Sequence, residues 1–266
     1  MLNKIDKASA LHGMAPVANK GINLTFVGPV KLAGNTTSKA IIKDIGAQEI
    51  AKEAFAAVLG RAMGLPIPTP LLVGVDKAII TPVNATGLSD GNTYLFFGSQ
   101  LVGPPTLAQL CINALASKIV NELINRWPAA GEGYAFDTWI ANIDRNTNNI
   151  MFDGINEVWL IDHGLAFTGN QLPNGKAEAG HEFPNKMDLW LIPNLDSASK
   201  TSFANSINNL VTMAGSLNLK EIVESCQLTS LLGQNDRTAI TEFVEERLNH
   251  VRALAATSSG LPIPMV

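Results

Sequence analysis

Residues 136–167 constrain the fold more than any other stretch of this chain. Asp144 and Asn149 stand five residues apart in D-R-x-x-x-N, and a third polar position, Asp162, opens an Asp-His-Gly sequence. Two short hydrophobic runs between them, within residues 150–161, are separated by turn-forming residues and predict a hairpin. Carboxylate and amide oxygens are hard ligands that suit Mg²⁺. The stretch therefore predicts a hairpin that carries a metal-bound carboxylate site.

A turn rich in small and hydroxyl residues, followed by a strand, lies nearer the N-terminus. The turn covers residues 34–38, and the strand covers residues 39–43 and ends at Lys43. Backbone N–H groups and hydroxyls of such a turn can approach phosphate oxygens, and the lysine can reach them with a full charge. Without later context, an ordinary hairpin with a solvated lysine is the simpler explanation. The candidate phosphate-contacting residues of the turn are Gly34, Asn35, Thr36, Thr37 and Ser38.

Residues 47–63 predict a helix with a candidate partner for Lys43. Its Ala, Glu and Leu content favours helix, its apolar residues recur at helical spacing, and Gly64 and Pro66 follow its end. Glu53 lies beside small residues that permit close approach, so its carboxylate could pair with Lys43 and hold it in place. A solvated helix carboxylate is the alternative from local sequence.

Strands are expected to dominate the first hundred residues. The mixed composition of residues 1–20 predicts a loose arm. Gly28-Pro29 predicts a break after the first strand. Alternating or continuous apolar residues predict strands over residues 22–27, 30–33, 39–43, 70–76, 78–82 and 93–101.

The last of these strands is followed by Gly103-Pro104-Pro105, which predicts a change of direction. We therefore divide the chain into a β-rich part, residues 1–103, and a helical part, residues 104–266. Exposed backbone around Gln100 and Leu101 could hydrogen-bond a nucleotide base, although a plain linker explains the boundary equally well. Helices are expected over residues 107–127, 186–192, 197–215, 219–232 and 237–256.

The composition excludes several classes of protein. Hydrophobic residues make up 46% of the chain and charged residues 16%, which is enough to build a substantial core. A net charge of −4 argues against a nucleic-acid-binding surface. No window approaches the roughly 18 uninterrupted apolar residues that span a bilayer. Cys111 and Cys226 match no metal spacing and are expected to be reduced and buried. We expect a cytoplasmic protein with no membrane and no direct nucleic-acid partner.

Taken in order, these parts follow the order of the protein-kinase motifs: phosphate turn, strand lysine, helix glutamate, linker, catalytic Asp, metal-binding Asn and metal-binding Asp. The chain resembles the HipA-like kinases, bacterial serine/threonine kinases known from toxin–antitoxin systems. The resemblance covers roughly residues 30–170 and points to a compact member that has the kinase core alone. It is carried by Phe136-Asp137, by N-x-D-R-N-x-x-N at 142–149, by I-D-H-G at 161–164 and by the run E-A-F-A-A-V-L-G-R-A-M-G-L-P-I-P at 53–68. No His-Arg-Asp precedes the loop, which reads Asn142-Ile143-Asp144-Arg145.

The resemblance implies an α+β, two-lobed protein-kinase-like fold with a small β-rich N-lobe and a mainly helical C-lobe. It also implies ATP and Mg²⁺ as cofactors and a role for each site residue. Asp144 would accept or orient the proton of the attacking hydroxyl, and Asn149 and Asp162 would hold Mg²⁺. Lys43, positioned by Glu53, would neutralise phosphate charge.

Residues near the candidate catalytic positions are expected to have structural or regulatory roles. Arg145 is expected to brace the catalytic loop by pairing with a carboxylate, with a surface arginine as the alternative. His163, which replaces the Phe of Asp-Phe-Gly, is expected to pack rather than transfer protons. By analogy with relatives, Thr36, Thr37 and Ser38 are candidate autophosphorylation sites.

Several functions stay open at this stage. The resemblance favours a protein serine/threonine kinase, of toxin type, whose substrate could be a translation factor or an aminoacyl-tRNA synthetase and whose partner could be an antitoxin. A lipid or small-molecule acceptor, transfer of AMP, and a non-catalytic nucleotide-binding module are alternatives. A purely structural helical scaffold would leave Asp162 unexplained.

Overall fold

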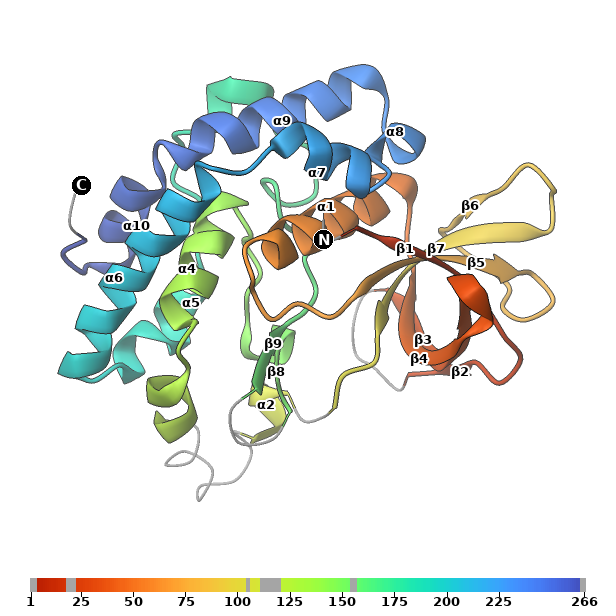
Figure 1. Cartoon of the computed structure of the whole chain (residues 1–266), viewed down its shortest axis with the longest axis horizontal. Helices are drawn as coiled ribbons and strands as arrows, with labels where there is room; N and C mark the ends of the chain where they lie inside the picture. Colours follow the sequence, from red (N-terminus) through yellow and green to blue (C-terminus); the bar gives the residue numbers. More distant parts are fainter. Residues whose placement is uncertain (1–3, 18–22, 104–105, 111–120, 154–156, 264–266) are drawn as a thin grey trace.

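The computed structural model of the chain describes residues 4–17, 23–103, 106–110, 121–153 and 157–263. Strands gather in the first hundred residues and helices follow, which confirms the expected mixture of a sheet and helices (Figure 1). The strands are β1 (Asp6–Ala10), β2 (Ala15–Pro16), β3 (Leu24–Leu32), β4 (Thr37–Asp44), β5 (Pro70–Asp76), β6 (Thr86–Gly87), β7 (Thr93–Gln100), β8 (Ile150–Asp153) and β9 (Glu157–Leu160).

Most of the helices follow the large sheet in sequence. Residues 121–126 are also helical, whereas the middle of the helix expected over 107–127 lies outside the described residues. The α-helices are α1 (Ala47–Ala62), α2 (Leu107–Leu110), α4 (Ala130–Trp139), α5 (Met187–Trp190), α6 (Ser197–Ala214), α7 (Leu219–Ser225), α8 (Leu228–Leu231), α9 (Gln234–Leu248) and α10 (Val251–Ser259). The 3₁₀ turns are η1 (Ala33–Asn35), η2 (Thr147–Asn149), η3 (Gly175–Glu178) and η4 (Ile192–Asn194).

Five strands of the large sheet close into a ring in the order β1-β5-β7-β4-β3, because β3 pairs back with β1. β1 runs parallel to β5 and antiparallel to β3. The expectation of a loose arm over residues 1–20 is therefore wrong where it covers β1. Ala8 and Ala10 alternate with exposed residues along that strand and are buried inside the ring, and this burial holds the strand in the sheet.

Two further expectations about the strands are wrong. Gly28-Pro29 does not break a strand, since β3 runs through it with Gly28 opposite Ala40. A Cβ on Gly28 would lie 2.7 Å from Met14 Sδ, so the glycine permits close approach instead. Residues 78–82 form a turn and coil rather than a strand.

Asp44 explains the path of the chain after that turn. Its fully buried carboxylate accepts backbone N–H groups of Val83, Asn84 and Ala85 at 2.6 to 3.0 Å. A buried carboxylate is tolerated only when it is hydrogen-bonded. The N–H groups of this loop therefore bind Asp44 and do not pair with a neighbouring strand.

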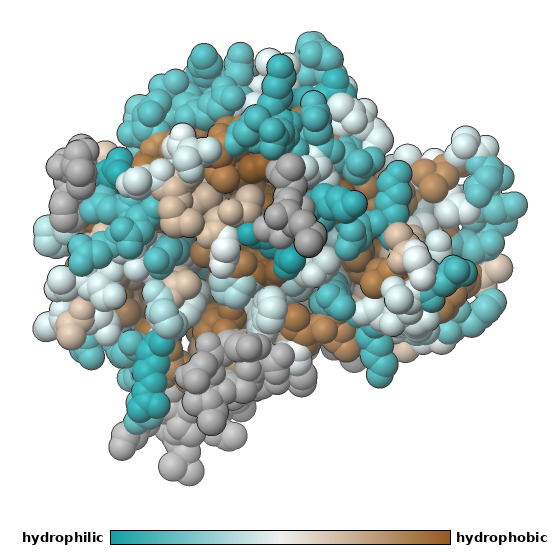
Figure 2. Space-filling model, in the orientation of Figure 1, coloured by the Kyte–Doolittle hydropathy of each residue, from teal (hydrophilic) through white to brown (hydrophobic). Residues whose placement is uncertain are grey.

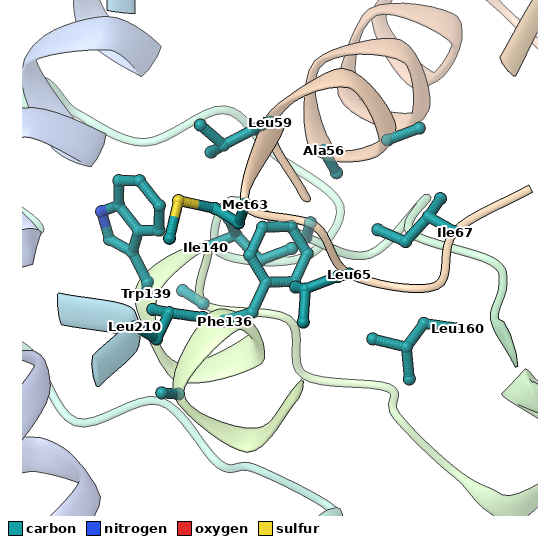
Figure 3. Packing of buried hydrophobic residues seen from close by; sticks show 14 of the residues in the cluster. Ala56, Leu59, Met63, Leu65, Ile67, Phe136, Trp139, Ile140, Leu160 and Leu210 are labelled. Carbon is teal, nitrogen blue, oxygen red and sulfur yellow. The ribbon is translucent and has the colours of Figure 1, made fainter. Parts of the chain in front are cut away.

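α1 lies at the centre of the molecule, between the large sheet and the helices (Figure 1). Every residue from 50 to 60 is buried. Gly60 allows the helix to approach α4, since a Cβ there would lie 2.9 Å from Phe136 Cζ. Figure 3 shows the resulting core, in which Met63, just after α1, lies beside Trp139 and Ile140, and Leu65 lies beside Phe136. A second, smaller core fills the sheet ring with Ala8, Val30, Ile42, Val73 and Phe96 among its members.

The C-terminal helices match the expectations in part. α6 confirms the helix expected over 197–215, but the one expected over 219–232 is divided into α7 and α8 at Gln227, which has a φ of 59°. The helix expected over 237–256 is likewise divided into α9 and α10. α9 buries Ile240, Phe243 and Val244, and Figure 2 shows hydrophilic residues along the edge where α9 runs.

Cys226 is a buried free thiol, as expected, and burial raises its pKa to about 12. Cys111 lies outside the described residues. Within the described part of the chain, every helix falls short of the length and apolar character needed to cross a membrane.

Candidate functional site

The side chains of Lys43, Glu53 and Asp162 meet at one point, although they come from β4, α1 and the segment after β9. Lys43 lies near the end of β4, on the face opposite to the buried Ile42 and Asp44. Its Nζ contacts Glu53 Oε1 of α1 at 2.5 Å and Asp162 Oδ1, just after β9, at 2.8 Å. The predicted Lys43–Glu53 pair is thus present. Glu53 is 2% exposed, whereas 48% of the Asp162 side chain faces solvent.

Lys43 and Asp162 hold each other in their ionised forms, whereas burial and the Asp162 charge disfavour the ionised form of Glu53. Burial alone would lower the pKa of Lys43, but the carboxylates of Glu53 and Asp162 raise it above its ordinary value. Burial would raise the pKa of Asp162, yet the Lys43 ammonium holds it at about 2. Burial raises the pKa of Glu53, and Lys43 opposes that shift. Lys43 therefore carries a full positive charge at neutral pH, and Asp162 a full negative charge.

Glu53 also fixes the loop that carries Asp162. Its second oxygen, Oε2, accepts the His163 backbone N–H at 2.8 Å. Asp162 itself adopts a left-handed conformation with a φ of 59°, which Asp tolerates better than most residues. His163 is 2% exposed and packs edge-on against Phe136, so its expected packing role agrees with its position. Burial and the Arg145 charge lower the pKa of His163, which leaves it neutral.

Two polar residues of α1 that the sequence did not single out contact the same region. Lys52 is buried and donates to the Gly169 carbonyl. Glu49 Oε1 accepts the Asn23 amide at 2.8 Å, and a Cβ on Gly164 would lie 3.2 Å from the same oxygen. Helical spacing is the signal that could have found Glu49, because residues four apart share one face of a helix.

Arg145 is an internal brace and not a surface residue. Its Nε and Nη2 bond the two carboxylate oxygens of Asp137 at 2.7 and 3.0 Å, and both side chains are fully buried. Nη1 donates to the carbonyls of Asn149, at 3.0 Å, and of Ile161. One guanidinium therefore ties together α4, the end of the 142–149 loop and the residue before Asp162.

Asp144 and Asn149 lie in that braced loop. Asn149 Nδ2 donates to the Asp144 carbonyl at 2.8 Å, and no described residue donates to the remaining amide oxygen, Oδ1. The Asp144 carboxylate is partly exposed and contacts the ammonium of Lys186. Sequence reasoning missed Lys186, which stands just before α5 in no recognisable motif.

The expected hairpin is present, because β3 and β4 pair antiparallel as far as Lys31 and Thr37, but its turn is shorter than residues 34–38. Gly34 and Asn35 have left-handed φ values of 81° and 64° and lie in η1, whereas Thr37 and Ser38 already belong to β4. Gly34, Asn35, Thr36 and Thr37 are exposed. No contact joins them to Lys43 in the described structure, so their role in phosphate binding stays a prediction.

Gln100 and Leu101 use their backbone N–H groups within the sheet. Gln100 N donates to the Thr69 carbonyl and Leu101 N to the Lys39 carbonyl, both at 2.9 Å. The Gln100 side chain donates to Ser38 Oγ at 3.2 Å. A nucleotide base bound here would have to use other groups of the segment.

A family model described as "HipA-like kinase" matches residues 39–249, most of the chain. The chain belongs to the HipA-like kinase family. Among solved structures, this HipA-like kinase is similar to the crystal structure of CtkA, a proinflammatory kinase of Helicobacter pylori. The TM-score is 0.53 at 11% identity, over 92% of this chain and 97% of that chain. At such identity the likeness shows the fold alone. No curated protein matches the sequence.

Membership of this family supports a kinase-type phosphotransferase function, and it implies ATP as a ligand. Phosphoryl transfer depends on positioning and on charge compensation, so charged groups such as Lys43, Glu53 and Asp162 are candidates for such a site.

Proposed function

We propose that this HipA-like kinase is an Mg²⁺- and ATP-dependent protein serine/threonine kinase. Residues 1–103 and 104–266 would form its two lobes, with the five-stranded ring as the core of the first. The observation that carries the proposal is the contact of Lys43 with both Glu53 and Asp162. It brings a strand lysine, a helix glutamate and an acid 119 residues further along the chain to one point.

The donor set of the site fits a magnesium ion. Asp162 Oδ2 and Asn149 Oδ1 are hard oxygens to which no described residue donates. Among the described residues no three Cys, His, Asp or Glu side chains gather as a metal site of their own. A kinase site needs no such cluster, because phosphate oxygens complete the coordination. When bound, the metal neutralises and orients the phosphates.

The residues of the chain divide the remaining tasks. Lys43 would hold the phosphates through its charge, and Glu53 would keep the ammonium in position. Asp144 would orient the acceptor hydroxyl and take its proton. Arg145 would keep Asp144 and Asn149 in register with the Asp162 loop.

Incubation with α- and γ-labelled ATP tests this function directly. We expect the wild type to transfer the γ label, and the Asp144→Ala variant to bind Mg·ATP while transferring label at least 100-fold more slowly. If the acceptor gains the α label instead, the enzyme transfers AMP and not phosphate. ATP binding without transfer to any acceptor would identify a non-catalytic module.

The acceptor, the partner and the cellular role stay predictions. Growth and phosphoproteomes of cells that express wild type or Asp144→Ala test a toxin-type kinase, and identical results would contradict it. Mass spectrometry after ATP incubation tests autophosphorylation at Thr36, Thr37 or Ser38. A translation protein as substrate, an antitoxin and a cytoplasmic location are predicted from the resemblance and the composition.

A further inference from the structure

Lys186 brings a second positive charge to the site. Its ammonium contacts Asp144 Oδ1, although 42 residues separate the two in sequence. The 142–149 loop supplies no charge of this kind, because its one cation, Arg145, is fully buried and faces Asp137. The ammonium of Lys43 forms an ion pair with Asp162 and not with Asp144. Among the described residues, Lys186 is the cation that forms an ion pair with Asp144.

The backbone on both sides of Lys186 is fixed to the catalytic region. The buried Asn185 donates to two oxygens of α4 and accepts the Met187 N–H at 3.1 Å. Met187 is fully buried, and the Trp190 indole donates to the Arg145 carbonyl at 2.9 Å. An ordinary surface ion pair joins two mobile side chains and stabilises little. Here the fold itself delivers a partly exposed ammonium to the candidate catalytic acid.

We propose that Lys186 is a catalytic residue that contacts the γ-phosphoryl group of ATP during transfer, an inference that rests on the proposed kinase function. The acceptor hydroxyl oxygen forms a bond to the γ-phosphorus while the bond to the β–γ bridging oxygen breaks. ADP leaves with that electron pair, and Asp144 takes the hydroxyl proton. The γ-phosphoryl oxygens carry negative charge throughout this step and lie beside Asp144, where the Lys186 ammonium can exchange the carboxylate for them.

Three variants test this role. Lys186→Ala removes the charge, Lys186→Arg keeps it, and Lys176→Ala is the matched control. Lys176 is an exposed lysine ten residues earlier whose ammonium makes no hydrogen bond or ion pair with any described residue. We expect kcat of Lys186→Ala to fall roughly 100-fold, as for other single charge-stabilising groups. Lys186→Arg should recover most of that loss, and Lys176→Ala should match the wild type.

Nucleotide affinity separates a catalytic role from a structural one. Because the proposed contact is to the γ-phosphate, Lys186→Ala should weaken Mg·ATP binding and leave Mg·ADP binding unchanged. Equal weakening of both nucleotides, an unchanged kcat or a raised kcat would overturn the inference. If the wild type transfers the γ-phosphate and Lys186→Ala does so equally fast, the inference about Lys186 fails and the kinase function stands. If the wild type neither binds Mg·ATP nor transfers phosphate, the proposed function fails and the role of Lys186 fails with it.

Discussion

Replacing Arg145 by methionine should destabilise the whole protein, because the side chain joins three separate segments. Arg145 and Asp137 are both fully buried, and the guanidinium makes two bonds to that carboxylate. Two more bonds reach the carbonyls of Asn149 and Ile161. In the variant the Asp137 carboxylate keeps the Asn142 amide as a donor at 2.9 Å and loses its counter-charge. Breaking a buried pair in this way costs about 3–5 kcal/mol, a large part of a typical stability of roughly 5–15 kcal/mol.

Urea unfolding followed by tryptophan fluorescence measures this loss. Arg126→Met is the control, since that side chain is 67% exposed and its pair with Glu122 is a surface one, so we expect a change below about 0.5 kcal/mol. The double variant Asp137→Leu/Arg145→Met leaves no orphaned charge and should lose at least about 2 kcal/mol less than the sum of its single variants. A loss below about 1 kcal/mol for Arg145→Met, or simple additivity, would refute the reasoning.

Three further changes have defined outcomes. Gly60→Leu places side-chain atoms where a Cβ already lies 2.9 Å from the Phe136 ring, so thermal unfolding should show a loss of about 1–3 kcal/mol. Asp44→Ala leaves three backbone N–H groups of a loop without their buried acceptor, and urea unfolding should show a loss of at least about 2 kcal/mol. Asp162 has a folded-state pKa of about 2, below its ordinary value, so its contribution to stability is present above about pH 4 and is lost as the pH falls towards 2. The urea midpoint of Asp162→Asn should therefore change less with pH in that window than the midpoint of the wild type. An equal change of the midpoint with pH in both proteins would contradict the ion pair with Lys43.

The parts of the site that follow from local spacing could be predicted from sequence. Asp144 and Asn149 share one loop, and Lys43 and Glu53 are ten residues apart on consecutive elements. Such positions are constrained by short-range geometry, and α1 has the composition and periodicity of a helix. The carboxylate partner of Arg145 was expected, although its identity, Asp137, needed the structure.

Contacts between distant segments could not be predicted. β1 becomes a strand because it pairs with β5, more than sixty residues away, and its own sequence carries little strand signal. Lys186 reaches Asp144 because the segment around Trp190 is fixed to the catalytic loop, a tertiary effect without a motif. The division of the C-terminal helices at Gln227 occurs without glycine or proline, the residues that usually mark such breaks.

The central claim is that Asp162 and Asn149 bind the metal of a nucleotide that Lys43 also contacts. A crystal structure with Mn²⁺ and a non-hydrolysable ATP analogue tests it most directly, because anomalous scattering locates the ion independently of the protein model. We predict one peak bonded to an Asp162 carboxylate oxygen and to Asn149 Oδ1, at distances near the roughly 2.1 Å of Mg²⁺ sites, with the Lys43 ammonium on the phosphates. A nucleotide and metal bound away from these residues would contradict the account.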